Sequence, residues 1–352
     1  TYDAGAGSLV GTADTDYTVN YTIEDAITLA TAEKDGYVFA GWEVTSENTT
    51  LTNGNFVKGT LYTEGTIDAG MYGNVTLTAK WTARDDMQYK INFYLMDTTG
   101  SYDEVVPSVV PRNDGTTGEE ISISLAGEVS EDTHTIVVIG GTEYSFDGFV
   151  VDEEMSDLAD MFVSADGSTE IDIYFERNQY SLEIIKQAGI GSVLIGINGE
   201  EKTEYSTEIM VYYQAEIEIE VTVSDGYTWA GYTVEGTTPT GFDTSATDET
   251  LSQTVTMGLG DSSITVRATI NSYTLTIDAN EGTYQGVEET TVRQNYQSTY
   301  TFDTPTREGY EFAGWTLNEG ATGAISGSVE EGFTYTFGYT NDTATAVWAA
   351  NR

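Results

Sequence analysis

A seven-residue motif returns along this chain, and it constrains the fold more than any other feature. Gly36 to Trp42 reads Gly-Tyr-Val-Phe-Ala-Gly-Trp, and Gly309 to Trp315 reads Gly-Tyr-Glu-Phe-Ala-Gly-Trp. A third copy, Gly226 to Tyr232, keeps the spacing, and a degraded fourth copy spans Tyr144 to Phe149. Aligned on their second glycines, the copies fall at positions 41, 148, 231 and 314. Recurrence at such intervals predicts a chain of small, similar units.

Alternating apolar residues predict strands around each motif. Strict alternation means that one face of a strand is buried and the other is solvated. The strands that close the units carry Val75, Leu77, Ala79 and Trp81; Ile171, Ile173 and Phe175; Ile264, Val266, Ala268 and Ile270; and Ala344, Ala346 and Trp348. The strands that open the later units carry Tyr89, Ile91 and Phe93; Tyr180, Leu182 and Ile184; and Tyr273, Leu275 and Ile277.

Two local signals refine this pattern. Asn198-Gly199, between apolar runs, predicts a tight β-hairpin, and Ile217, Ile219, Val221 and Val223 predict another half-buried strand. Helix is expected to be scarce, and Glu154 to Phe162 is its best candidate. The sequence therefore predicts an all-β to α+β fold.

We divide the chain into repeat 1 (residues 1–83), repeat 2 (84–178), repeat 3 (179–272) and repeat 4 (273–352), and expect each to be a domain. The joining segments, 82–88, 176–179 and 271–272, are short and lack Gly/Ser or Pro/Ser tracts. Short links of this kind favour a semi-rigid, elongated rod over flexibly tethered beads.

Charge and composition exclude several classes of function. The 352 residues include 58 acidic and 13 basic residues, giving a net charge of −45. Nucleic acid and anionic membranes are poor partners for such a chain, because binding them needs clustered Lys and Arg. The acidic surface is better explained by solubility than by cation binding. Cysteine is absent, so the repeats must hold together by core packing.

No apolar run is long enough for a membrane helix, so we expect no membrane insertion within this segment. No signal peptide is visible, because Thr1 opens in a strand-like segment. We expect this to be a fragment of a longer chain, with any signal and anchor outside it.

Repeats 1 and 4 resemble the InlB B-repeat, also called the Listeria–Bacteroides repeat. The resemblance rests on Tyr273 to Gly282 and Thr304 to Trp315 in repeat 4, and on Tyr2 to Ala4, Gly36 to Trp42 and Asn74 to Trp81 in repeat 1. Repeats 2 and 3 look like divergent relatives, with some likeness to mucin-binding repeats, and repeat 2 lacks the Trp. The resemblance implies small β-grasp-like units in tandem on a bacterial cell surface, without catalysis, and it names no ligand.

The residues that could carry chemistry have simpler structural explanations. Trp42, Trp81, Trp229, Trp315 and Trp348 all occupy motif or strand positions, which favours core anchors over a sugar-stacking platform. The motif glycines are expected to serve a turn or a bulge. His134 is the only histidine, so multi-His metal sites are excluded, and its segment Glu131 to Thr135 reads as a solvated turn. We therefore expect no catalytic, cofactor-binding or metal-binding residues, and no cofactor.

Two further possibilities depend on acidic and lysine side chains. Asp152-Glu153-Glu154 with Asp157 and Asp160, and Asp14 with Asp16, could bind Ca²⁺, but neither has the spacing of an EF-hand loop. A Lys–Asn isopeptide cross-link needs a buried lysine. Lys80 is expected to point outward by alternation with Trp81, and Lys34 to lie in the turn before Gly36.

Two functions from different classes remain. The first is a non-catalytic stalk or spacer in a bacterial cell-surface protein, extracellular and monomeric, attached to the cell wall through regions outside this segment. The second is an adhesion module that binds a host or neighbouring-cell glycan or protein. Tyr212-Tyr213 is the best candidate for an exposed contact, because adjacent strand residues face opposite ways.

Overall fold

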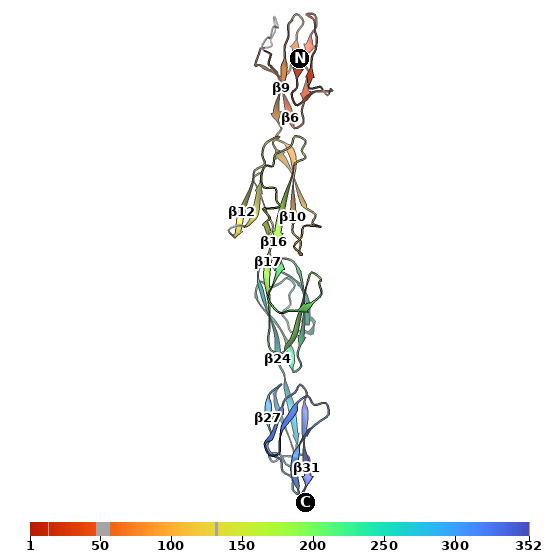
Figure 1. Ribbon diagram of the computed structural model, residues 1–352, viewed down its shortest axis with the longest axis vertical. Helices are drawn as coiled ribbons and strands as arrows, with labels where there is room; N and C mark the ends of the chain where they lie inside the picture. Colours follow the sequence, from red (N-terminus) through yellow and green to blue (C-terminus); the bar gives the residue numbers. More distant parts are fainter. Residues whose placement is uncertain (13, 47–56, 131–132, 352) are drawn as a thin grey trace. The chain divides into compact units, whose positions relative to one another are not determined.

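The described part of the chain is built from β-strands (Figure 1). The computed structural model of the chain describes residues 1–12, 14–46, 57–130 and 133–351. Within these residues there is no α-helix, and one short 3-10 helix, Asp248–Leu251, is present. The all-β expectation is therefore confirmed.

The chain divides into two compact units, Thr1–Arg177 and Asn178–Arg352. Each unit contains two mixed sheets with a common plan. In every mixed sheet the opening strand of the repeat pairs in parallel with its closing strand. The strand that begins at the Gly-aromatic motif pairs antiparallel with the other side of the closing strand.

The first unit holds the sheets of repeats 1 and 2. The mixed sheet of repeat 1 has the order β3-β1-β9-β6-β7, and that of repeat 2 has the order β11-β10-β16-β15. These strands are β1 (Tyr2–Asp3), β3 (Asp16–Tyr17), β6 (Tyr37–Val44), β7 (Leu61–Tyr62), β9 (Leu77–Ala83), β10 (Met87–Leu95), β11 (Ser108–Gly115), β15 (Phe149–Val151) and β16 (Glu170–Arg177).

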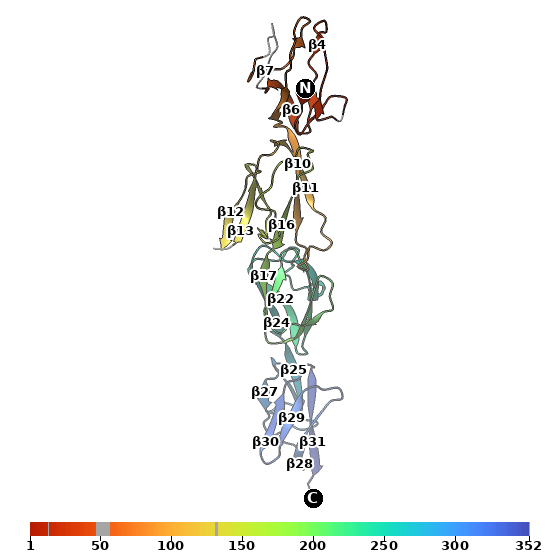
Figure 2. The same ribbon diagram turned by 45° about the horizontal axis from the view of Figure 1, so that its top comes forward.

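Smaller sheets complete this unit. Repeat 1 adds two two-stranded sheets, and repeat 2 adds a three-stranded sheet that lies beside β10 and β16 in both views (Figures 1 and 2). Their strands are β2 (Ser8–Leu9) with β5 (Ala32–Glu33), β4 (Ile27–Thr28) with β8 (Thr66–Ile67), and β12 (Ile123–Ser130), β13 (Thr133–Ile139) and β14 (Thr142–Ser145).

The second unit holds the sheets of repeats 3 and 4. Their mixed sheets have the orders β20-β17-β24-β22 and β26-β25-β31-β28. These strands are β17 (Gln179–Lys186), β20 (Ile209–Tyr212), β22 (Tyr227–Gly236), β24 (Ser262–Ile270), β25 (Ser272–Asp278), β26 (Glu289–Asn295), β28 (Tyr310–Leu317) and β31 (Asp342–Ala350). The partner sheets are β19 (Thr203–Glu204), β18 (Ile190–Ile197), β21 (Glu216–Val223) and β23 (Ser252–Thr256), and β27 (Thr299–Thr301), β30 (Gly332–Thr336) and β29 (Ala324–Ser328).

The predicted alternation places the apolar side chains in the cores. Ile264 and Val266 on β24, and Ile217 and Ile219 on β21, are almost wholly buried and belong to one cluster. A second cluster draws only on residues 2–79 and a third only on residues 275–344. Each of these cores is therefore built within one repeat, from the inner faces of its own sheets.

The two motif glycines perform different tasks. The first motif glycine, at Gly36, Gly226 and Gly309, lies in a turn and has a positive φ. The residue after it closes this turn by donating its N–H to the carbonyl three residues earlier. At the second, at Gly41, Gly231 and Gly314, the ladder shifts by a β-bulge. Because positive φ costs glycine little, both tasks select it. The expected turn and bulge are confirmed.

The alignment of the fourth motif copy on its second glycine is wrong. Phe149 pairs with Arg177 at the end of β16, as Tyr37 pairs with Ala83 at the end of β9. Phe149 also donates its N–H to the carbonyl of Phe146, so Gly148 closes the turn and matches Gly36. Repeat 2 has no glycine five positions later, and the β15–β16 ladder has no bulge.

The predicted helix at Glu154 to Phe162 is also wrong. Ser156 accepts the backbone N–H of Tyr174 through its hydroxyl, and Asp157 accepts that of Asp172 through its carboxylate. These side chains bond to the backbone of β16, which holds the segment in a non-helical conformation. Asp160 has a positive φ, which ends any helical run. The predicted Asn198-Gly199 hairpin is confirmed, with positive φ at both residues.

Candidate functional site

The tryptophans lie in or against the cores, but they are not equally buried. Trp42 is wholly buried and Trp229 is nearly so, whereas Trp81, Trp315 and Trp348 are half-buried. All five indoles are therefore mostly buried, as core anchors are expected to be, although Trp81, Trp315 and Trp348 keep a minority of their surface exposed.

Indole N–H groups fix several of these rings. Trp42 donates to the carbonyl of Ala30, Trp229 to the hydroxyl of Thr250, and Trp348 to the carbonyls of Ala279 and Asn280. The N–H of Trp315 is buried without a partner, although its ring stacks on Phe302 at a centroid distance of 4.7 Å. These contacts are typical of tryptophans that anchor a core.

His134 does not lie in a solvated turn. It is the second residue of β13, pairs with Glu128 on β12, and is about a quarter exposed. Its Nδ1 lies 2.8 Å from a carboxylate oxygen of Glu153. Glu131 and Asp132, the start of the predicted turn, lie outside the described residues. The side chains beside the His134 ring are therefore two glutamates, Glu128 and Glu153.

The acidic residues considered for calcium serve separate partners. Asp152 accepts the backbone N–H groups of Glu154 and Met155, Glu153 faces His134, and Asp157 binds the backbone of β16. In the part of the chain that the structure describes, no three acidic or histidine side chains converge as a metal site would require.

The lysines that form ion pairs lie at the surface. Lys80 pairs with Glu43 at 2.6 Å and is half exposed, as alternation with Trp81 predicts. Lys90, Lys186 and Lys202 are also between 30% and 54% exposed. Lys34 lies in the turn before Gly36, with its Nζ 3.7 Å from the ring centroid of Tyr37. The four ion-paired lysines, Lys80, Lys90, Lys186 and Lys202, are solvated, which does not favour an isopeptide cross-link.

The expectation that one of Tyr212 and Tyr213 is exposed is wrong, because both are half-buried. Tyr212 ends β20 and packs against the core of repeat 3. Tyr213 follows the strand end, where alternation no longer applies, and its N–H is bound by the carbonyl of Asn178.

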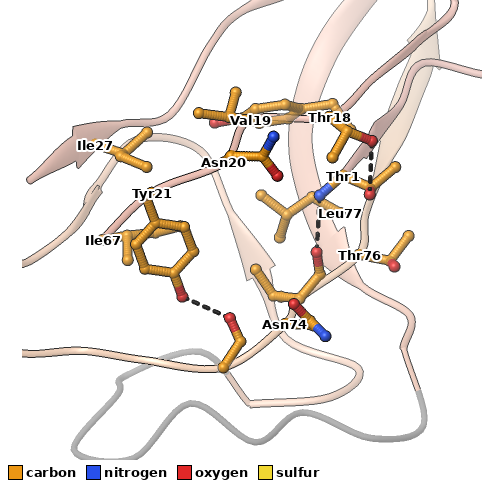
Figure 3. Close-up of a pocket in the computed structure, with 13 residues that line it drawn as sticks. Thr1, Thr18, Val19, Asn20, Tyr21, Ile27, Ile67, Asn74, Thr76 and Leu77 are labelled. Atoms are coloured by element: carbon orange, nitrogen blue, oxygen red, sulfur yellow. Dashed lines mark hydrogen bonds between the residues drawn. The ribbon is translucent and has the colours of Figure 1, made fainter. Parts of the chain in front are cut away.

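A cavity of about 210 Å³ lies in repeat 1 (Figure 3). Its wall runs from Thr18 to Tyr21 on one side and from Gly73 to Leu77 on the other, closed by the hydrogen bond from the Tyr21 hydroxyl to the Gly73 carbonyl. Burial raises the pKa of the Tyr21 hydroxyl. The side chains of the lining include no carboxylate, histidine or lysine.

A tyrosine surface on repeat 2 was not anticipated. Tyr94 on β10 and Tyr174 on β16 are stacked, with ring centroids 4.5 Å apart and an angle of 10°, and Tyr102 meets Tyr174 edge-on at 5.2 Å. We call these three residues the tyrosine cluster. Burial raises the pKa of all three hydroxyls, so the three tyrosines are neutral near pH 7.

Polar side chains extend the tyrosine cluster along the same two strands. Asn92 donates from its amide to Glu170 and to Asp172, at 3.1 and 2.7 Å, and Lys90 pairs with Glu170. Alternation with the core residues of β10 and β16 assigns these residues to the opposite face of the sheet, where Asn92 is nevertheless buried. What the sequence lacked was the parallel register, which sets Tyr94 directly beside Tyr174.

Comparison with known protein families gives a match at both ends of the chain. Residues 1–80 and 273–334 match the Listeria-Bacteroides repeat domain, as the sequence motifs indicated. No curated protein matches the chain. Among the described residues, no helix is long and apolar enough to cross a bilayer.

Proposed function

Residues 1–80 and 273–334 match the Listeria-Bacteroides repeat domain, and from this premise we propose that the chain is a non-catalytic spacer in a bacterial cell-surface protein. It is extracellular, and it holds another part of the protein away from the cell wall. The wall attachment lies outside this segment.

The observation that carries the proposal is the fourfold return of one sheet plan. Every mixed sheet pairs its opening and closing strands in parallel, and every motif turn places a Gly-aromatic step at the start of the neighbouring strand. We therefore propose four domains, 1–83, 84–178, 179–272 and 273–352. A chain of similar units is what a spacer requires, since length is added by repetition.

We further propose that each domain is β-grasp-like. The opening and closing strands lie side by side in the interior of each mixed sheet, as β25 and β31 do, and one or two small sheets take the place of a crossover helix. The cores drawn from residues 2–79, from 182–266 and from 275–344 support independent packing of three of these domains.

Small-angle X-ray scattering tests the spacer. A compact globule of 352 residues would have a radius of gyration of about 20 Å. We expect a clearly larger value for an elongated rod, changing little between low and high salt. A compact distance distribution would contradict the spacer. Labelling of intact source cells with antibodies against the chain tests its location, and signal confined to lysed cells would contradict extracellular exposure.

The absence of catalysis is part of the proposal. We expect a panel of glycosidase, esterase and peptidase substrates to remain at background, because the sole histidine lies between two glutamates, where it does not activate a serine hydroxyl or a cysteine thiol. Turnover that disappears in a His134→Ala variant would contradict this.

A second candidate function is adhesion through the tyrosine cluster. Stacked Tyr94 and Tyr174 offer an apolar ring surface to a sugar, and the neighbouring carboxylates of Glu170 and Asp172 offer acceptors to its hydroxyls. A glycan array probed with the chain tests it. Binding that is lost in Tyr94→Ala but kept in Tyr72→Ala, whose side chain is exposed elsewhere, would favour adhesion. If the native chain binds no glycan on the array, adhesion through the tyrosine cluster is contradicted and the spacer remains the proposed function.

A further inference from the structure

The residues that link neighbouring repeats form the same pair of backbone hydrogen bonds at two places. Within the first unit, Arg84 donates its N–H to Gly36 at 3.0 Å and accepts from Thr117 at 2.9 Å. Within the second unit, Asn271 donates to Gly226 at 2.9 Å and accepts from Tyr296 at 2.9 Å. One linker residue thus joins the motif turn of one repeat to the repeat that follows.

The donor from the following repeat occupies an equivalent position each time. Thr117 comes two residues after the end of β11, and Tyr296 comes directly after β26, the second strands of their mixed sheets. In repeat 3, Tyr213 after β20 likewise donates to the carbonyl of its own linker residue, Asn178, at 2.8 Å. The contact is therefore a recurrent property of the repeats.

Side chains reinforce the two junctions. The Thr117 hydroxyl donates to the Gly36 carbonyl at 2.6 Å, so this carbonyl accepts from both sides of the junction. At the other junction Thr228 bonds the side chain of Asn271, and the rings of Tyr227 and Tyr296 meet edge-on with centroids 5.9 Å apart.

The motif glycine is covered by the following repeat. A Cβ on Gly226 would lie 2.4 Å from the ring of Tyr296, and a Cβ on Gly36 would lie 2.6 Å from the Cα of Ala165. Gly309 provides the contrast: it has the same φ as Gly226, +84°, yet a Cβ there would meet nothing within 4 Å. Asn351 still donates to the Gly309 carbonyl at 3.0 Å. The turn and its linker bond at Gly309 therefore form with no described residue over the glycine, whereas Tyr296 covers Gly226.

We propose that the motif turn together with the linker carbonyl is a docking surface for the next repeat, which couples the stabilities of repeats 1 and 2 and of repeats 3 and 4. The glycine has two roles: positive φ in the turn, and room for the incoming residue. The inference rests on the proposed four-domain division and is independent of the proposed cell-surface location.

Hydrogen exchange on the full chain separates these two roles. In Gly226→Ala, the peptides containing Asn271 and Tyr296 should exchange at least about tenfold faster, because the added methyl group displaces Tyr296. Gly309→Ala imposes the same backbone strain without that clash, and it should accelerate only its own turn and Asn351. Equal effects of the two variants, each confined to its own turn, would overturn the proposal.

Perturbation from the other side of the junction should give the reciprocal result, since coupling between two sites is mutual. Tyr296→Ala should accelerate exchange in the turn at residues 224–227 of repeat 3, whereas Tyr310→Ala, on an exposed ring, should not. At the other junction, Thr117→Val should accelerate the turn at residues 34–37. Thr135→Val, which also removes a hydroxyl bound to a glycine carbonyl, should leave that turn unchanged. Unchanged rates at 224–227 in Tyr296→Ala would refute the docking surface, whatever scattering shows about the rod.

Discussion

At the residue scale, the same motif position gives two tryptophans different surroundings. Trp42 is wholly buried against Tyr2 and Phe39, and its indole N–H is bound by Ala30. Trp315 is half-buried, and its indole N–H has no partner. The motif fixes the residue type, while the neighbours fix what that residue contributes to stability.

These surroundings predict unequal losses on truncation. Trp42→Ala should lower the free energy of unfolding of repeat 1 by about 3–5 kcal/mol, as for a large aromatic removed from a core. Trp315→Ala should cost repeat 4 less, because less buried area and no hydrogen bond are lost. Hydrogen exchange of core peptides in each repeat measures both losses, and a larger loss for Trp315→Ala would contradict the argument.

A second residue-scale prediction concerns Asp114. Its hydrogen bonds with Arg112 lower the pKa of the carboxyl, and Arg112 in turn bonds Thr142 and Tyr144 of β14. This carboxylate therefore stabilises repeat 2 above its unfolded pKa of about 3.9, and the contribution is lost as pH falls through the lower folded pKa.

The Asp114→Asn variant isolates that contribution. Because the Asp114 side chain is half exposed, we expect a loss of only about 0.5–1 kcal/mol at pH 7. The difference from the native chain should persist at pH 5 and shrink only below about pH 4. Denaturant unfolding across this range measures it, and a difference that stays constant into strong acid would exclude the ion pair as its source.

At the element scale, local patterns predicted what depends on one strand or turn at a time. Alternation placed Ile264 and Val266 in the core, and Asn198-Gly199 gave the hairpin. The sequence failed where a second segment decides the outcome. Glu154 to Phe162 has helical spacing, but Ser156 and Asp157 bind β16 instead.

In the candidate site, too, the sequence failed where the pairing of distant strands decides the position of a residue. His134 was misplaced because the pairing of β12 with β13 is not visible in the sequence. The tyrosine cluster was missed because it depends on the parallel register of β10 and β16, which are about eighty residues apart in the chain. Contacts between distant strands are the information that propensity and periodicity do not carry.

The bulges provide an element-scale prediction. Gly231 and Gly199 have almost the same φ, +78° and +76°, but a Cβ on Gly231 would lie 2.6 Å from the Thr244 carbonyl oxygen, while one on Gly199 would meet nothing. Gly199→Ala should therefore cost about 1 kcal/mol through backbone strain alone. Gly231→Ala should lower the free energy of unfolding by more than Gly199→Ala does, because strand β22 must also move. Thermal unfolding compares the two, and equal costs would show that φ alone selects the bulge glycine.

At the scale of the whole molecule, the balance of charge dominates. The described cations are largely paired already: Lys80 with Glu43, Arg84 with Asp86, Lys90 with Glu170, Arg112 with Asp114, Lys186 with Glu204, Lys202 with Glu220, and Arg307 with Glu281. With 58 acidic residues against 13 basic ones, most carboxylates have no cationic partner. Folding brings these carboxylates together, so their repulsion opposes the compact state.

Salt should therefore stabilise this chain. Raising NaCl from 0.01 to 0.15 M shortens the Debye length from about 30 to about 8 Å, which screens repulsion between distant carboxylates. The same salt weakens the surface ion pairs, but solvent already screens each of these, so each contributes little. The unpaired carboxylates outnumber the pairs, so the melting temperature should rise, with most of the gain below about 0.2 M. A melting temperature that falls with NaCl would show that the ion pairs outweigh the repulsion.

Calcium distinguishes screening from a specific site. Because no three acidic or histidine side chains converge among the described residues, CaCl₂ should stabilise the chain only as NaCl of equal ionic strength does, apart from weak accumulation around a strongly negative surface. Binding at a built site would instead add stability that grows with the logarithm of calcium concentration above its dissociation constant. Melting curves in EDTA, in CaCl₂ and in matched NaCl make the comparison. A rise at submillimolar calcium, absent in matched NaCl, would place a cation site in this chain, and the loss of that rise in Asp152→Asn or Asp16→Asn would identify which acidic segment provides it.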